Sequence, residues 1–376
     1  MNSTRIEVDE ELMTNKIALG GRSIMVVLLL LILFLIFFKS KIHIKDFNCD
    51  YISSKNSAYI KGIFTIFVFY RHCHTYIVLN SIVDYPMILV DRLLLQNLVA
   101  MFFFYSGYGI YERIKEKGYN YIKSFPKKRL LAIFINFAIV IISFLIMDII
   151  LGRINDYSIK TILLSFIGWE SVGNSNWYIF VVFLQYIFLI ISFNIFKKSN
   201  KKAIFSMIIM NGLYCVIVLF FKPQHWMNTS FCFISGMIYS YNKERIENFL
   251  MKNKNYLITG TLGLIVFVGL MYILLTYKVS ICTVILSQLF LLLIVLFTMK
   301  IEINSKILYS LGSNVFWIYT LQRIPMIVLK VNGLDKYPYV YFVICFIITI
   351  LLATIYEKVF NKIVNNLINK NTKKEK

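Results

Sequence analysis

The sequence predicts an all-α protein built as a polytopic bundle of transmembrane helices. Hydrophobic residues make up 59% of the 376 residues and charged residues only 16%, and the mean hydropathy is +0.70. Soluble domains have about 45–50% apolar and about 25% charged residues, so this composition excludes an ordinary soluble globule. The apolar residues also form long uncharged blocks along the whole chain, which is the pattern of a protein that crosses a bilayer many times.

A membrane-spanning helix needs about 20 mainly apolar residues, and this rule marks ten or eleven segments. The first lies too far from the N-terminus for a removed signal peptide and lacks a small-residue cleavage site, so we expect a retained anchor. The segment at 226–241 is short, which leaves the count open. The expected helices are 24–38, 58–79, 88–111, 130–151, 175–196, 203–221, 226–241, 256–276, 280–299, 307–330 and 337–357.

These helices divide the chain into three regions. Residues 1–56 hold a polar tail, the additional N-terminal anchor and a cytoplasmic loop, and residues 57–357 form the main membrane domain of about ten helices. Residues 358–376 are a basic cytoplasmic tail.

The positive charge predicts how the chain is oriented. The formal net charge is +21, from 40 Lys and Arg against 19 Asp and Glu. Of these 40 basic residues, 27 fall in loops on one side of the predicted bilayer and nine on the other. The positive-inside rule therefore places the N-terminus outside and the C-terminus in the cytoplasm. The basic loops serve topology and contact with anionic membrane lipids, and they give no case for a nucleic-acid partner.

Ionisable and amide side chains at membrane depth are the candidate functional residues, because they are expensive to bury there. The second predicted helix carries Lys61 and His72, eleven residues apart, on one face and separated by about 16 Å along the axis. At 1.5 Å of rise per residue, His72, Gln96 and Gln322 each lie roughly 21–22 Å from the cytoplasmic ends of their helices. We therefore expect one cavity at this outer level. The residues that flank it are Arg71, Asn97 and Arg323.

A second polar level is expected near the cytoplasmic face. Lys61 and Ser106 lie at this level, close to the basic residues Lys127, Lys128 and Arg129 of the predicted cytoplasmic loop. A site at the outer level with an entrance below suits a reaction that joins the two compartments.

Structural explanations of these residues stay open. A lone buried histidine such as His72 is often only a hydrogen-bond partner between helices, and Arg71 could snorkel or pair with Asp91. No metal site is expected, because the six cysteines are scattered without a Cys-x-x-Cys pattern. His72 and His74 are two residues apart, so on a helix they do not face a common ligand point.

Several motifs resemble those of acyltransferase family 3, integral-membrane enzymes that O-acylate glycans. The segment IKGIFTIFVFYRH resembles the family's first core helix, with a basic residue (Lys61), ten intervening residues and a catalytic histidine (His72). Its Lys-Gly pair resembles the sugar O-acetylase branch. MFFFYSGYGIYER, which contains Ser106, and FPKKRLL, which contains Arg129, resemble the next two motifs. Further similar segments are SNWYIF at 175–180, FISGMIYS at 233–240 and LGSNVFWIYTLQ at 311–322.

Two positions depart from the family pattern. Many members carry arginine where this chain has Lys61, and the late helix often ends in Leu-His where this chain has Leu321 and Gln322. Lysine lacks the two-pronged geometry with which arginine binds anions. Gln322 is therefore expected to act as a hydrogen-bonding positioner.

The resemblance implies transfer of an acyl group, usually acetyl, from cytoplasmic acyl-CoA to a hydroxyl of an extracytoplasmic or lipid-linked cell-surface glycan. His72 would be the general base, and developing charge on the carbonyl oxygen would need donors, for which Arg71, Gln96 and Gln322 are candidates. Lys61, which also counts with the catalytic set, is expected to help bind the CoA donor. The other donor-binding candidates are Ser106, Lys128 and Arg129, and the candidates for acceptor binding are Glu170, Asn176 and Trp177.

The resemblance also sets the expected surroundings. The protein would be a multi-pass protein of the cell membrane, with acyl-CoA as a donor substrate, no permanently bound cofactor, and glycan-assembly proteins as possible partners. Direct transfer and an acyl-His72 intermediate both remain open.

A different class of function fits the same polar residues. A transporter or flippase for a lipid-linked glycan or a small metabolite would also place polar groups at the bilayer midplane. Such folds usually show inverted repeats and pairs of broken helices in corresponding positions, and the sequence shows neither. An enzyme that acylates a lipid or peptidoglycan is the third alternative.

Overall fold

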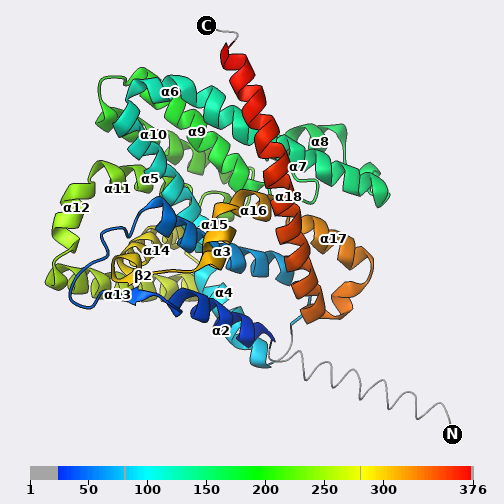
Figure 1. Ribbon diagram of the computed structural model, residues 1–376, viewed down its shortest axis with the longest axis horizontal. Coiled ribbons are helices and arrows are strands. Elements are labelled where there is room, and N and C mark those ends of the chain that lie inside the picture. Colours follow the sequence, from blue (N-terminus) through cyan, green and yellow to red (C-terminus); the bar gives the residue numbers. More distant parts are fainter. Residues whose placement is uncertain (1–23, 80–81, 280, 374–376) are drawn as a thin grey trace.

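The computed structural model describes residues 24–79, 82–279 and 281–373, and most of them are helical (Figure 1). The predicted all-α bundle is confirmed. The polar start predicted for residues 1–22 and the last three residues of the basic tail lie outside the described residues. Two short strands, β1 (Lys41–Ile42) and β2 (Ile301–Glu302), pair antiparallel beside the bundle.

Six helical segments of the described chain are long and apolar enough to cross a membrane. The count rises to seven if the pair Ile82–Leu94 and Gln96–Lys117, bent by 71°, forms one span. The chain is therefore a multi-pass membrane protein, while the predicted count of ten or eleven spans stays a prediction. The six segments are Tyr119–Ile150, Trp177–Ile195 (α9), Asn200–Val218 (α10), Asn253–Tyr277 (α13), Ile281–Lys300 (α14) and Pro338–Phe360.

Most of the remaining elements lie within predicted segments, but 88–111, expected as one helix, is interrupted at Leu95–Val99 and bends by 71°. The helices among them are α2 (Ile24–Phe37), α3 (Ser54–His74), α4 (Tyr85–Leu94), α5 (Ala100–Lys117), α6 (Tyr119–Phe125), α7 (Leu131–Ile150), α8 (Ile159–Ser165), α11 (Phe231–Tyr241), α12 (Lys243–Leu250) and α18 (Pro338–Lys373). Short turns of other helix types are η1 (Ile82–Asp84), η2 (Leu95–Val99), η3 (Pro126–Leu130), η4 (Ile154–Asp156), η5 (Gln224–Trp226) and η6 (Leu334–Lys336). The last helix runs well into the predicted cytoplasmic tail.

The segment 307–330, expected as one helix, is instead three short helices. They are α15 (Lys306–Ser313), α16 (Val315–Leu321) and α17 (Arg323–Val331). Pro325 has no backbone N–H to donate to the carbonyl of Leu321, which weakens the helix where α16 ends.

Two glycines bring the backbones of α5 and α11 into direct contact. A Cβ at Gly107 would lie 1.9 Å from the carbonyl oxygen of Phe233, and one at Gly236 would lie 2.0 Å from that of Phe104. Each glycine therefore accommodates the backbone of the other helix, as small residues do at helix contacts within membranes.

The same arrangement joins α3 to α15. A Cβ at Gly62 would lie 2.0 Å from the carbonyl oxygen of Leu308, and one at Gly312 would lie 1.8 Å from that of Ala58. Gly62 and Gly107 directly follow Lys61 and Ser106 in the chain. The close helix contacts therefore also fix the backbone positions from which these two polar side chains extend.

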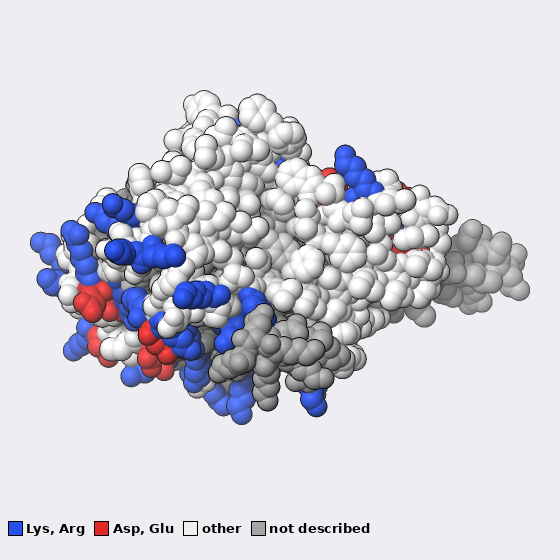
Figure 2. All heavy atoms as spheres, turned by 90° about the horizontal axis from the view of Figure 1, so that it is seen from above, with Lys and Arg blue, Asp and Glu red and all other residues white. Residues whose placement is uncertain are grey.

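Charge is unevenly distributed over the surface. Figure 2 shows most of the visible Lys and Arg gathered at one end of the molecule, a smaller charged group toward the other end, and a broad white region between them. An uncharged belt next to a basic end is the surface expected of a membrane protein. The assignment of the basic end to the cytoplasm stays a prediction.

Candidate functional site

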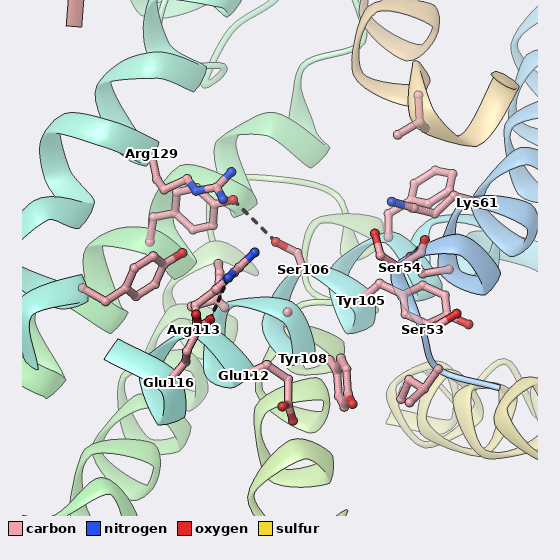
Figure 3. A pocket seen from close by; sticks show the side chains of 18 of the residues that line it. Ser53, Ser54, Lys61, Tyr105, Ser106, Tyr108, Glu112, Arg113, Glu116 and Arg129 are labelled. Carbon is pink, nitrogen blue, oxygen red and sulfur yellow. Dashed lines mark hydrogen bonds and ion pairs between the residues drawn. The ribbon is translucent and has the colours of Figure 1, made fainter. Parts of the chain in front are cut away.

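A large cavity opens between α3, α5 and η3. Its volume is about 790 Å³, and Lys61, Ser106 and Arg129 lie on its walls. Figure 3 shows Lys61 on one side, Arg129 on the other and Ser106 between them. We call this space the larger cavity. It brings together three of the four residues predicted to bind the donor, whereas Lys128 is exposed and does not line it.

The larger cavity also contains groups that sequence reasoning did not identify. Arg113 lines it and pairs with Glu116 at 2.6 Å, and Glu112 accepts a hydrogen bond from the Ser240 hydroxyl at 2.6 Å. The hydroxyls of Ser106 and Tyr186 lie 3.5 Å apart. Basic, acidic and hydroxyl groups therefore share one wall, at the end of α5 where the predicted cytoplasmic loop begins.

A second cavity lies near the other end of α3. Its volume is about 300 Å³, and we call it the smaller cavity. His72, Arg71 and Gln96 line it, as predicted from their common depth, and Asn176 and Trp177 line it as well. The remaining lining residues are Val68, Leu98, Val99, Ser171, Asn174, Ser175, His225, Tyr319 and Arg323.

The His72 imidazole is held by two residues of the broken late segment. The Nε and one terminal nitrogen of Arg323 lie 3.3 and 3.2 Å from His72 Nδ1. Tyr319 meets the imidazole edge-on, with ring centroids 6.0 Å apart. His72 therefore has a fixed orientation at the cavity wall.

Arg71 is held by α4. Its Nε donates to Asp91 Oδ1 at 2.8 Å and a terminal nitrogen donates to the Asp91 carbonyl at 2.6 Å. This contact matches the structural alternative considered for Arg71, since its guanidinium is partly engaged. The side chain still lines the smaller cavity.

The loop before α9 forms the far wall of the smaller cavity. The Asn176 amide donates to the Gly168 carbonyl at 3.0 Å, and Trp177 meets His225 edge-on with ring centroids 5.7 Å apart. Partial burial lowers the pKa of His225, so this ring is neutral at neutral pH. The sequence pattern had given no reason to place His225 at a site.

Two other predicted residues lie away from the cavity lining. Glu170 pairs with Lys222 at 2.9 Å, and the Lys222 ammonium also lies over the ring of Trp169 at 4.6 Å. Gln322 is buried and donates to the Tyr319 carbonyl at 3.0 Å. Their proposed roles in acceptor binding and positioning stay predictions that this geometry does not favour.

Aromatic side chains separate the two cavities. Tyr178 lines the larger cavity, Tyr319 lines the smaller one, and their rings meet with centroids 5.3 Å apart. The chain of contacts runs from the larger cavity through Tyr178 and Tyr319 to His72.

The described residues contain no group of three or more His, Cys, Asp and Glu side chains suited to hold a metal ion. The chemistry on offer consists of an imidazole, amides, guanidinium groups and hydroxyls in two cavities. Such groups can bind an anion and move a proton.

Residues 55–358 match the family model Acyl_transf_3, which describes an acyltransferase domain. The chain belongs to acyltransferase family 3. The resemblance drawn from Lys61, His72 and Ser106 is thereby confirmed, and this family member is a membrane acyltransferase. No curated protein and no solved structure matches the chain.

Proposed function

We propose that the protein transfers an acetyl group from cytoplasmic acetyl-CoA to a hydroxyl of an extracytoplasmic or lipid-linked cell-surface glycan. The observation that carries this proposal is the pair of cavities at the two ends of α3. One has three basic residues on its walls beside two glutamates, and the other has a histidine among amides and guanidinium groups. An acyltransferase that joins two compartments needs one such space for each substrate.

The larger cavity suits the donor. CoA carries several phosphate charges, and Lys61, Arg113 and Arg129 supply positive groups around one space. Ser106 adds a hydroxyl between Lys61 and Arg129. The thioester sits at the end of the long, flexible arm of CoA, which can reach from the charged wall toward Tyr178.

The smaller cavity suits the acceptor. Sugars are recognised by amide hydrogen bonds and aromatic faces, and Asn176, Gln96 and Trp177 offer both. A sugar hydroxyl is a poor nucleophile at neutral pH, and His72 is the neighbouring group able to take its proton as it attacks the thioester carbonyl. Arg71 lies in the same cavity and is our candidate donor to the developing negative charge on the carbonyl oxygen.

The setting follows from this division of roles. The enzyme would work in the cell membrane, take acetyl-CoA from the cytoplasm as a substrate, and act beside proteins that assemble the glycan. Membrane lipids would surround its uncharged belt.

Replacement of His72 by glutamine tests the proposal, with His74→Gln as the matched control. His74 lies two residues along α3 and faces the Tyr70 ring, with centroids 5.5 Å apart, so it tests the same substitution on another face. We expect His72→Gln to reduce acetyl transfer about 10²-fold or more, the usual contribution of general base catalysis. His74→Gln should retain transfer.

Two readouts make the result decisive. Acetyl-CoA consumption is measured with purified protein in native lipids and a glycan extract as acceptor, and surface glycans of the producing cells are examined by mass spectrometry for a lost acetyl group. Undiminished transfer by a normally abundant His72→Gln protein would remove the catalytic assignment. Glycan movement across the membrane without acetyl-CoA consumption would favour the transporter alternative.

A further inference from the structure

Arg323 contacts the imidazole of His72 at one particular atom. Two of its nitrogens, Nε and a terminal nitrogen, lie 3.3 and 3.2 Å from Nδ1. Arg323 is the first residue of α17, directly after Gln322. Among the described residues, Arg323 has no carboxylate partner, and the nearest aromatic face is that of Tyr76 at 6.0 Å.

The chemistry of a guanidinium decides what Nδ1 can be. Arginine has five N–H donors and no acceptor, and a neutral imidazole has one N–H and one lone pair. The nitrogen that faces Arg323 must therefore present its lone pair, which leaves the proton on Nε2. Within the part of the chain that the structure describes, Nε2 makes no hydrogen bond.

The positive charge of Arg323 also favours the neutral form of the His72 imidazole. A second positive charge on His72 would lie next to a guanidinium that has no neighbouring carboxylate to balance it, and like charges at this distance repel strongly away from water. The contact therefore holds the imidazole neutral as well as oriented. A neutral imidazole with an unprotonated Nδ1 can accept a proton at that nitrogen.

We propose that Arg323 is a positioning residue that reserves Nδ1 of His72 as the base nitrogen of the transfer reaction. The proposal rests on the acyl transfer proposed above. In the resting state the guanidinium donates to Nδ1, and when the acceptor binds, its hydroxyl takes this place and donates to the same lone pair.

The proton and electron pairs of the step then balance as follows. The hydroxyl proton moves to Nδ1 as the oxygen forms a bond to the thioester carbon. The carbon–sulfur bond breaks when the tetrahedral intermediate collapses, and the CoA sulfur leaves as a thiolate. The imidazolium returns its proton to that sulfur, which regenerates neutral His72 and gives the free thiol of CoA.

Solid-state NMR of the full chain in lipid bilayers reads the tautomer directly. The chain has only four histidines, so labelling them with ¹⁵N and ¹³C gives a spectrum in which His72 is assigned by its loss in His72→Gln. At neutral pH we expect an unprotonated Nδ1 and a protonated Nε2 at His72. A proton on Nδ1, or on both nitrogens, would overturn the proposal whether or not the protein transfers acetyl groups.

Variants of Arg323 test the role in turnover. Arg323→Met should give His72 a mixture of tautomers and lower kcat about tenfold or more, as expected for loss of a hydrogen bond to a charged group. The KM for acetyl-CoA should stay unchanged, because Lys61 and Arg129 line the other cavity. Arg323→Lys, which keeps a charged donor, should restore the tautomer and part of kcat.

The control is Arg92→Met, which removes an exposed arginine of α4 outside both cavity linings. It should leave the His72 spectrum and kcat as they are. If Arg323→Met also leaves both unchanged, Arg323 has no positioning role. If the wild-type protein transfers no acetyl group but shows the expected tautomer, the function proposed above fails while the assignment of Nδ1 stands.

Discussion

Replacement of Gly107 by alanine is expected to separate α5 from α11 and destabilise the bundle. The added Cβ would lie 1.9 Å from the Phe233 carbonyl oxygen, whereas real Cβ contacts essentially never fall below 3.0 Å. The two helices must therefore move apart by roughly 1 Å. The obstructing atom belongs to the backbone of α11, so no side-chain rotation can relieve the clash.

The expected cost follows from that geometry. Overpacking of a well-packed interior costs about 1–3 kcal/mol, and a rigid obstacle favours the upper end of this range. The better helix propensity of alanine returns about 1 kcal/mol. The net loss for Gly107→Ala is thus about 2 kcal/mol in the free energy of unfolding.

Gly109→Ala is the matched control, two residues along the same helix. A Cβ at Gly109 would have no atom within 4 Å. This variant should gain up to about 1 kcal/mol from helix propensity alone, so the two variants should differ by about 3 kcal/mol. Gly109 lines the larger cavity, so stability and not activity is the readout.

Thermal unfolding in detergent, followed with a thiol-reactive dye, suits this comparison. Four of the six cysteines are buried, including Cys232 on α11, and they react only when the bundle opens. The difference of about 3 kcal/mol corresponds to an apparent Tm gap on the order of 6 °C, compared at one scan rate. Equal Tm values for the two variants, or a less stable Gly109→Ala, would refute the close-contact reasoning.

Three further predictions concern the two cavities and the loop beside them. Arg129→Met should raise the KM for acetyl-CoA with little change in kcat, while Lys128→Met, outside the cavity lining, should change neither; a larger effect of Lys128 would contradict the donor assignment. Lys222→Met should lower the free energy of unfolding by about 1 kcal/mol, because it leaves the Glu170 carboxylate without its partner and removes an ammonium from the face of Trp169. An unchanged Tm would show that this loop is held by other contacts. His225 has a lowered pKa in the folded protein, so the unfolded chain binds more protons and stability falls as pH drops below about 6.5. His225→Gln should therefore reduce the Tm difference between pH 7.5 and pH 5.5. An equal Tm difference in the wild-type protein and the variant would exclude this contribution.

The sequence predicted the helices well because each needs a long apolar segment, which is visible without knowledge of neighbours. It also predicted that Lys61 and Ser106 would share one level and that His72 and Gln96 would share another. Both were derived from helical rise alone, although the segment 88–111 is interrupted at η2 and α5 continues to Lys117. The cavities therefore contain most of the residues expected of them.

The late segment shows where this reasoning stops. A helix over 307–330 gives Gln322 the depth of His72, but in the structure Gln322 donates to the Tyr319 carbonyl and its neighbour Arg323 contacts the imidazole. Pro325 was the available signal for a break, although one proline does not give the new direction of the chain. The Tyr178–Tyr319 contact was equally invisible, because hydropathy does not distinguish a tyrosine between two cavities from one that faces lipid.

The glycine contacts have a consequence for how material can pass between the two cavities. Helices whose backbones are in contact cannot slide or tilt past each other easily. We therefore expect α3 with α15, and α5 with α11, to move as rigid pairs. Transport by rocking of one half of a bundle against the other needs helix interfaces that can shift, and these two interfaces are closely packed. We expect passage of the acyl group between the cavities to depend on rotation of single aromatic rings, while the helices themselves stay in place.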